Sequence, residues 1–249
     1  NIDEIIEVSD GVMVARGDLG VEVPFEQVPI LQKEFIKKCN NAGKIVITAT
    51  QMLETMTSNP RPTRAEISDV ANAVYDATWA TMLSGESAMG KYAVECVKTM
   101  ARIAEAVEND INYWKRLSKK DVYLEQKNYE LKIGHTIAKT AMDMEAKAIF
   151  AYTEVGDTPK ILASYHPNCP IYALTTNEKT YRQLSLAWGT TPILVKEGNN
   201  ADEVIENGIK QAQEMGFVQK GDIVVLAGGA TALSNNQESM NRTIGGVVR

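Results

Sequence analysis

A short apolar run at 12–15 passes directly into Arg16-Gly17-Asp18, and this junction constrains the fold more than any other feature of the chain. Continuous apolar runs are typical of strands buried in parallel sheets, and α/β folds place their chemistry at the carboxyl ends of such strands. We therefore expect Asp18 where a barrel enzyme would hold a metal ligand or a base. Gly17 would let a ligand approach the backbone closely. No helix-length segment precedes the run, which indicates a chain that begins in the middle of a fold.

The first part of the chain repeats a strand-then-helix pattern. Strands are predicted at 12–15, 45–49 and 78–83, and the helices that follow them at 27–41, 64–74 and 94–107. Each repeat has the length of a βα unit, on the order of 30 residues. Three such units are too few to close an eight-stranded barrel, so the pattern predicts the last part of a larger (β/α) domain.

A polar, charged stretch at 112–130 predicts a connector and a domain boundary, which divides the chain into 1–111 and 112–249. Beyond it, helices alternate with strands. The helices are predicted at 133–145, 159–165, 178–187 and 201–215, and the strands at 148–152, 171–174, 192–195 and 222–227. A last strand near 243–248 would add an antiparallel edge, so we expect a mixed, mainly parallel sheet.

Composition argues against several functional classes. The net charge of −6 does not suit a general nucleic-acid-binding surface. No apolar run is long enough to span a bilayer, and no signal peptide is visible. The cysteines Cys39, Cys96 and Cys169 are odd in number and lack CxxC spacing, which indicates neither a disulfide framework nor a zinc site and favours a reducing, cytoplasmic location. His135 and His166 are isolated, and we interpret both as surface or structural residues.

The predicted strands of the first half all end in polar residues. Arg16-Gly17-Asp18 follows the first, Thr48–Met52 closes the second, and Ser84-Gly85-Glu86 follows the third. If the strands are neighbours in a barrel, these groups face one mouth. An acid beside hydroxyls and a second acid suits a hard cation such as Mg²⁺ and a phosphorylated substrate.

Each of these strand ends also has a purely structural interpretation. Asp18 is equally suited to capping a helix or a turn, and Thr50 to a β-branched strand end. Ser84 and Glu86 are compatible with a turn and a helix-start acid. The combination of three such ends favours a site over any one of these alternatives.

Two loops outside this pattern carry weaker signals. Residues 59–66 form a rigid, basic loop before a helix, which is compatible with an anion or interface contact or simply with a capped, solvated helix start. Thr63 and Glu66 match a capping box there. Gly228-Gly229-Ala230-Thr231 follows a predicted strand but lacks a complete nucleotide-binding pattern.

Several segments resemble signature segments of the pyruvate kinase family. They are Met13–Glu22, Ala49–Glu54, Pro60–Glu66, Asp69–Val74 and Met82–Glu86. The match is close over 1–110 and looser beyond. The resemblance implies an α/β chain that comprises the last three βα units of a TIM (β/α)8 barrel, followed by a C-terminal regulatory α/β domain.

The same resemblance implies a phosphotransferase of glycolysis, which moves the phosphoryl group of phosphoenolpyruvate to ADP and yields pyruvate and ATP. Asp18 would be one of two carboxylate ligands of a catalytic Mg²⁺ (or Mn²⁺). The backbone groups of Gly17 and Asp18, with Thr50, would hold the substrate carboxylate. Thr50, Ser84 and Glu86 would belong to the polar region linked to protonation of the enolate. Arg16 resembles a subunit-interface residue of the homotetrameric, cytoplasmic family.

Some of the family's residues have no counterpart here. Its phosphoryl-contacting lysine, second metal-binding glutamate and K⁺ site would lie upstream of Asn1, so we expect these 249 residues alone to be inactive. The alternative is a non-catalytic effector-binding or oligomerisation module. The sequence Asp76-Ala77-Thr78-Trp79-Ala80-Thr81 departs from the family's pattern at the third strand and brings the local packing of that strand into question more than its chemistry.

The predicted regulatory half also departs from the family at its effector loop, 153–160. Glu154 and Asp157 would repel a phosphate, although Thr158 and Lys160 remain to bind one. We therefore expect a sugar phosphate other than fructose 1,6-bisphosphate, or a nucleotide, as effector. The late glycine-rich loop, 228–236, is off the family pattern as well.

Overall fold

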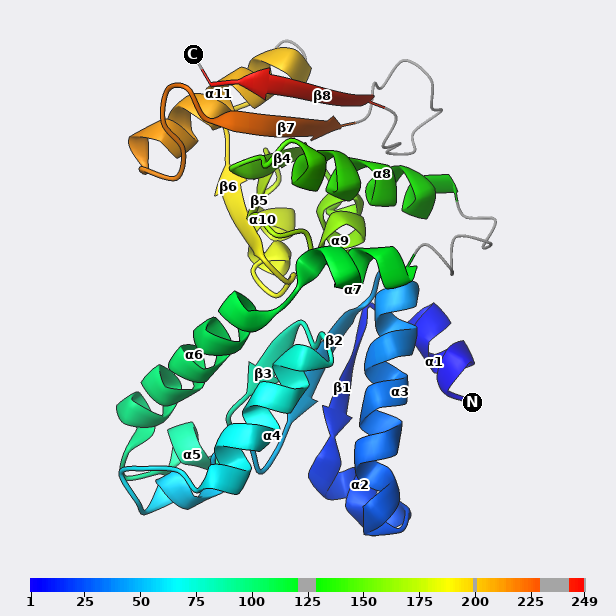
Figure 1. Ribbon diagram of the computed structural model, residues 1–249, viewed down its shortest axis with the longest axis vertical. Coiled ribbons are helices and arrows are strands. Elements are labelled where there is room, and N and C mark those ends of the chain that lie inside the picture. Colours follow the sequence, from blue (N-terminus) through cyan, green and yellow to red (C-terminus); the bar gives the residue numbers. More distant parts are fainter. Residues whose placement is uncertain (121–128, 199–200, 229–241, 249) are drawn as a thin grey trace. The chain divides into compact units, whose positions relative to one another are not determined.

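The computed structural model describes residues 1–120, 129–198, 201–228 and 242–248. The chain forms two compact units, Asn1–Ile111 and Asn112–Arg249. Each unit has its own sheet with helices packed on it (Figure 1).

The sheet of the first unit is parallel, with the order β1-β2-β3. Its strands are β1 (Gly11–Ala15), β2 (Ile45–Ala49) and β3 (Ala80–Met82). In the register, Val14 pairs with Thr48 and Thr48 with Thr81. Because the strands are parallel neighbours, their carboxyl ends lie along one edge, as the strand-then-helix pattern predicts.

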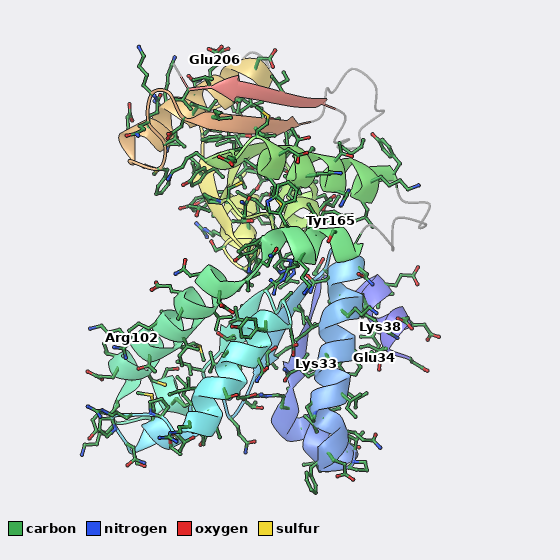
Figure 2. The ribbon with its side chains drawn as sticks, viewed as in Figure 1. Lys33, Glu34, Lys38, Arg102, Tyr165 and Glu206 are labelled. Atoms are coloured by element: carbon green, nitrogen blue, oxygen red, sulfur yellow. The ribbon has the colours of Figure 1, made fainter. Side chains whose placement is uncertain are left out.

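The long helices of this unit follow the strands, and shorter ones fill the turns. They are α1 (Ile2–Val8), α2 (Arg16–Glu22), η1 (Phe25–Gln27), α3 (Val28–Asn41), η2 (Glu54–Thr57), α4 (Arg64–Tyr75), α5 (Gly85–Ala88) and α6 (Ala93–Asp110). The expectation that no helix precedes the first strand was wrong. Helix α1 packs there through its buried Ile6. Lys38 of α3 (Figure 2) also forms an exposed ion pair with Asp3 of α1 at 2.8 Å.

The loop after β2 is anchored in the core. Met52, Leu53 and Met56 are fully buried against α4 and α6, where Val70 and Cys96 meet them. Burying one such apolar side chain stabilises the fold by roughly 1.5–3 kcal/mol. The loop that leaves the end of β2 is therefore held by packing, which restricts how its polar residues are presented.

The unusual third strand packs well. The Nε1 of Trp79 donates to the Oδ1 of Asn40 at 2.8 Å, and the Oγ1 atoms of Thr48 and Thr78 are hydrogen-bonded at 3.0 Å. These side chains are all at most 6% exposed. Buried polar groups are tolerated when they are hydrogen-bonded, so the departure from the family pattern at Thr78-Trp79 does not disrupt the sheet.

The second unit has the sheet order β6-β5-β4-β7-β8, in which only β8 is antiparallel. Its elements are α7 (Tyr113–Lys120), α8 (Tyr129–Asp143), β4 (Ala148–Tyr152), α9 (Asp157–Ser164), β5 (Ile171–Thr175), α10 (Glu178–Leu184), β6 (Thr190–Leu194), α11 (Ala201–Glu214), β7 (Ile223–Gly228) and β8 (Arg242–Val247). This confirms the predicted mixed, mainly parallel sheet with an antiparallel edge strand.

Helix α7 occupies part of the stretch predicted as a polar connector. Its Leu117 is buried against Ala138 and Met142 of α8. This charged segment is therefore amphipathic, and its apolar face packs into the core. The remainder of that connector, 121–128, lies outside the described residues. Within the described ranges, no helix combines the length and the apolar character needed to cross a bilayer.

The isolated histidines and cysteines are packed inside. His166 lies 4.4 Å from the ring centre of Trp188, and His135 makes an edge contact with Tyr165. All the cysteines are buried free thiols. Burial raises the pKa of Cys39 to about 11 and that of Cys169 to about 12, which disfavours the reactive thiolate form of both.

Candidate active site at the strand ends

Arg16 ties the end of β1 to the loop that follows β2. Its Nη2 donates to the carbonyl oxygen of Thr50 at 2.5 Å, and its Nε lies 3.2 Å from the carbonyl oxygens of both Ala49 and Thr50. Its Nη1 forms an ion pair with Asp69 of α4 at 2.6 Å. The Arg16 side chain is 11% exposed, so these bonds use a guanidinium that is largely withdrawn from water.

The backbone at the end of β2 is left-handed over two consecutive residues. Thr50 has φ of 70° and Gln51 has φ of 52°. A β-branched residue rarely adopts this conformation, and each such residue costs about 1–3 kcal/mol unless its surroundings hold it. Arg16 supplies that restraint by binding the carbonyl of Thr50, while the buried Met52 anchors the next turn.

This turn brings the hydroxyl of Thr50 to the start of α2. The amide of Gly17 donates to the Oγ1 of Thr50 at 2.9 Å. A Cβ added to Gly17 would lie 3.7 Å from that oxygen, which is ordinary van der Waals contact. The folded chain therefore has room for a Cβ at Gly17. If glycine is required at this position, the reason would be space for a bound ligand.

Glu86 connects the third strand end to the same loop. It is fully buried, its Oε2 accepts from the amide of Ser84 at 2.7 Å, and its Oε1 accepts from the amide of Leu53 at 3.1 Å. The structural alternative considered for Glu86, a helix-start acid, agrees with its position in the first turn of α5. Its carboxylate also orients the loop that carries Thr50.

Glu66 links the far end of this loop to α4. It accepts from the amide and hydroxyl of Thr55 at 2.7 and 2.6 Å and completes the predicted capping box with Thr63. Burial alone raises the pKa of Glu66, but the hydrogen bonds from Thr55 and Thr63 outweigh burial and lower it.

Asp18 is the candidate metal ligand at this edge. It lies exposed in the first turn of α2, one residue beyond the amide that binds Thr50. Among the described residues, no group of three or more histidine, cysteine, aspartate or glutamate side chains could hold a metal ion. Mg²⁺ commonly binds one or two carboxylates, substrate phosphates and waters, so Asp18 fits as one ligand of such an ion.

The candidate effector residues lie in the second unit, at the start of α9. Thr158 is only 2% exposed, whereas Lys160 is half-buried. Gly156 has φ of 95°, and its amide donates to the Oγ1 of Thr153 at 2.8 Å. The loop between Thr153 and α9 is thus well ordered by its own bonds. Of the late glycine-rich loop, 229–236 lies outside the described residues.

Sequence reasoning located the three strand ends and missed the side chains that join them. The bonds of Arg16 to Asp69 and Thr50 span 53 and 34 residues. Glu66 was predicted as a capping residue, and both Glu66 and Asp69 belong to segments that resemble the family, but neither was predicted to hold the strand ends together. No local sequence pattern predicts such pairs, because the residues are far apart in sequence and meet only where α4 packs beside the sheet.

A parallel sheet of βα units with polar groups gathered at its carboxyl edge places the first unit among the α/β proteins that carry their sites at the ends of parallel strands. Two family models match the chain, "Pyruvate kinase, barrel domain" over 1–97 and "Pyruvate kinase, alpha/beta domain" over 132–241. The chain belongs to the pyruvate kinase family.

Individual relatives agree with this assignment. A pyruvate kinase of Clostridium acetobutylicum is 52% identical over 229 residues, covering 92% of this chain and 48% of the relative. One of Sporosarcina psychrophila is 51% identical, covering 92% of this chain and 39% of the relative. The crystal structure of a pyruvate kinase from Cryptosporidium parvum matches with a TM-score of 0.92 at 36% identity, covering 100% of this chain and 49% of that one. The chain thus spans about half, or less, of the length of these relatives.

Proposed function

We propose that this chain carries part of the active site of a pyruvate kinase, which transfers the phosphoryl group of phosphoenolpyruvate to ADP and yields pyruvate and ATP. The observation that supports it most is the hydrogen-bonded junction of the strand ends, where the amide of Gly17 binds the hydroxyl of Thr50. Glu86 joins the third strand end to the same loop. Residues that act on one substrate need such a fixed mutual geometry.

The chain's own residues suggest how a substrate carboxylate would be held. The Oγ1 of Thr50 accepts a hydrogen bond from Gly17, so its hydroxyl hydrogen can donate to an anion at the exposed edge. Arg16 holds the carbonyl of Thr50 and so keeps the hydroxyl in place. Glu86 acts through the loop backbone, which makes it a positioning residue in this proposal.

Asp18 would hold a divalent cation, Mg²⁺ or Mn²⁺. When bound, the cation would neutralise charge that develops on the phosphoryl group and the enolate oxygen. Asp18 is exposed and sits at the amino end of α2, where it can reach such an ion without leaving its helix. The second carboxylate, the K⁺ site and the remaining catalytic residues implied by the family are proposed to come from outside these 249 residues.

The test uses the intact enzyme, meaning the full polypeptide that contains this chain. Thr50→Val removes the hydroxyl at nearly constant volume, and Thr50→Ser retains it. We expect Thr50→Val to lower kcat/KM for phosphoenolpyruvate by roughly 10²–10³-fold, the range seen when a single preorganised donor is removed. Thr50→Ser should recover most of the activity. Equal activity of Thr50→Val and the parent enzyme would refute the proposed role.

The 249-residue polypeptide by itself provides a second test of this proposal. We expect no pyruvate formation from phosphoenolpyruvate and ADP, because the phosphoryl-contacting lysine and the second metal-binding carboxylate implied by the family are proposed to come from outside these 249 residues. Measurable turnover would contradict this expectation. Inactivity of the longer, intact enzyme would instead favour the alternative of a non-catalytic effector-binding or oligomerisation module.

We further propose that the second unit is regulatory and that the intact enzyme is a cytoplasmic homotetramer, with Arg16 near a subunit contact. The proposed effector is a sugar phosphate or a nucleotide held by Lys160 and the start of α9. The low exposure of Thr158 makes Lys160 the stronger of the two candidates. Titrating the intact enzyme with fructose 1,6-bisphosphate, other sugar phosphates and nucleotides tests this assignment, and strong activation by fructose 1,6-bisphosphate would contradict our expectation.

A further inference from the structure

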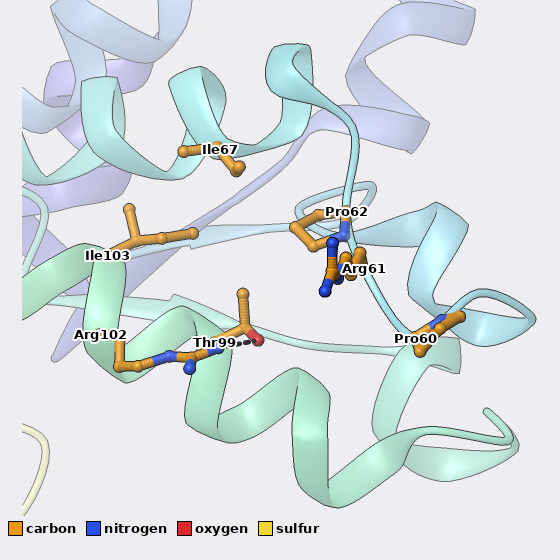
Figure 3. Close-up of a pocket in the computed structure, with 7 residues that line it drawn as sticks. All are labelled: Pro60, Arg61, Pro62, Ile67, Thr99, Arg102 and Ile103. Atoms are coloured by element: carbon orange, nitrogen blue, oxygen red, sulfur yellow. Dashed lines mark hydrogen bonds between the residues drawn. The ribbon is translucent and has the colours of Figure 1, made fainter.

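A separate pocket opens in the first unit between α4, α6 and the loop that precedes α4 (Figure 3). Its volume is about 360 Å³, which lies within the range of sites that bind small molecules, roughly 300–1,000 Å³. The residues that line it come from 60–62, the first turn of α4 and the middle of α6. None of them belongs to the strand ends that form the candidate active site.

Two arginines supply the charge of this pocket. The Nη2 of Arg102 donates to the Oγ1 of Thr99, a neutral acceptor, at 3.0 Å (Figure 3). Within the described parts of the chain, neither Arg61 nor Arg102 forms an ion pair with a carboxylate. Two guanidiniums beside one cavity provide forked donors that match a carboxylate or a phosphate.

The remaining lining is apolar. Pro60 and Pro62 contribute one wall, while Ile67 of α4 and Ile103 of α6 contribute the other (Figure 3). Ile67 is 41% exposed, which leaves much of a large apolar side chain in water. Covering it would remove apolar surface from water, which is favourable. A bare inorganic anion would leave this surface uncovered, so the lining favours an anion attached to an apolar body.

The wall of the pocket is held in place before any ligand arrives. Two prolines restrict the backbone on either side of Arg61. The capping box of Thr63 and Glu66 fixes the end of the loop, and Glu66 also binds Thr55 of the preceding turn. A preorganised wall reduces the entropy lost on binding.

We propose that this pocket is a binding site for a small amphipathic anion. The anionic group, a carboxylate or a phosphate monoester, pairs with Arg61 and Arg102, and a short aliphatic body covers Ile67 and Ile103. The two headgroups share the same recognition chemistry, and the experiment distinguishes them. The proposal concerns direct binding and does not depend on the proposed catalytic role.

The test is isothermal titration calorimetry of the purified protein with hexanoate and with hexyl phosphate. Two further probes separate these features: inorganic phosphate carries only the anionic group, and hexanol carries only the aliphatic body. We expect saturable binding of at least one amphipathic anion. Inorganic phosphate has no apolar body to cover the isoleucines, and hexanol has no charge to pair with the arginines, so each should bind at least about tenfold more weakly. The tighter of the two amphipathic anions identifies the headgroup.

Variants locate the binding. Arg61→Gln and Arg102→Gln should each raise Kd about tenfold or more, and Ile103→Asn should weaken hexanoate or hexyl phosphate without affecting inorganic phosphate. Lys98→Gln, on an exposed residue of α6 that does not line the pocket, should leave Kd unchanged. Circular dichroism confirms that each variant is folded. Absence of saturable binding, binding that both arginine variants retain, or equal binding of inorganic phosphate would each overturn the proposal.

Discussion

The guanidinium of Arg16 holds the carbonyl oxygen of Thr50 at 2.5 Å and the carboxylate of Asp69 at 2.6 Å, so one side chain joins β1, the loop after β2 and helix α4. The residue it restrains, Thr50, has a left-handed backbone that a threonine rarely adopts. The Thr50 hydroxyl is in turn the group that receives the amide of Gly17. Thr50 therefore takes part in both contacts: its carbonyl is held by Arg16, and its hydroxyl is the candidate substrate ligand.

The first prediction concerns this contact. Arg16→Met should lower the free energy of unfolding by about 1–3 kcal/mol, because it leaves Asp69 and the carbonyl of Thr50 without their donor. Asp69→Asn should cost less, since Asn retains an acceptor for the guanidinium. Urea titrations of the purified protein measure both.

Lys38→Gln is the matched control for Arg16→Met. Lys38 forms its pairs on the exposed face of α3 (Figure 2), and exposed ion pairs contribute little to stability. A midpoint shift for Lys38→Gln as large as that for Arg16→Met would show that Arg16 is an ordinary surface charge.

The second prediction separates folding from binding at Gly17. Because an added Cβ meets Thr50 only at 3.7 Å, Gly17→Ala should leave the melting temperature within a few degrees of the parent. In the intact enzyme, it should raise KM for phosphoenolpyruvate, since the methyl group would lie beside the Thr50 hydroxyl that is proposed to hold the substrate carboxylate. Steady-state kinetics and thermal melts of the same preparation test both parts. Unchanged kinetics would remove Gly17 from the proposed site.

The third prediction is a pH dependence of stability. The pKa of Glu66 is lowered from its ordinary 4.5 in the folded protein, so the unfolded state binds a proton more readily. Its stabilising contribution is complete above the unfolded pKa and is lost as the pH falls through the folded pKa. The free energy of unfolding should therefore decline as the pH falls below the unfolded pKa and through the lowered pKa of folded Glu66, and Glu66→Gln should flatten that part of the curve. Glu54→Gln, an exposed carboxylate nearby, should leave the slope in place.

The fourth prediction concerns the thiols. Burial raises the pKa of Cys39 and Cys96 to about 11 and that of Cys169 to about 12. At about pH 8 the native protein should react slowly with a disulfide reagent such as DTNB, because little thiolate forms and access is poor. Denaturant should release all three thiols at once. Rapid labelling of any cysteine in the native protein would show that its part of the core opens readily.

Local sequence signals sufficed for most elements of this fold. The apolar run at 45–49 became β2 with the predicted bounds, and Thr63 and Glu66 formed the predicted capping box. These two predictions were correct because strand burial and helix capping depend on residues that are close in sequence. Helices α1 and α7 escaped prediction because their stability comes from single buried residues, Ile6 and Leu117, that pack against distant elements.

The sequence by itself determined the family, the alternation of strands and helices, and the polar residues that end each strand. Only the tertiary structure decided that Arg16, Asp69 and Glu86 hold the loop of Thr50 in a left-handed turn, and that Arg61 and Arg102 border a common pocket. The physical reason is that strands and helices follow from periodic patterns among residues close in sequence. The contacts named here depend instead on how α4 and α6 pack in the folded unit, which no local pattern specifies.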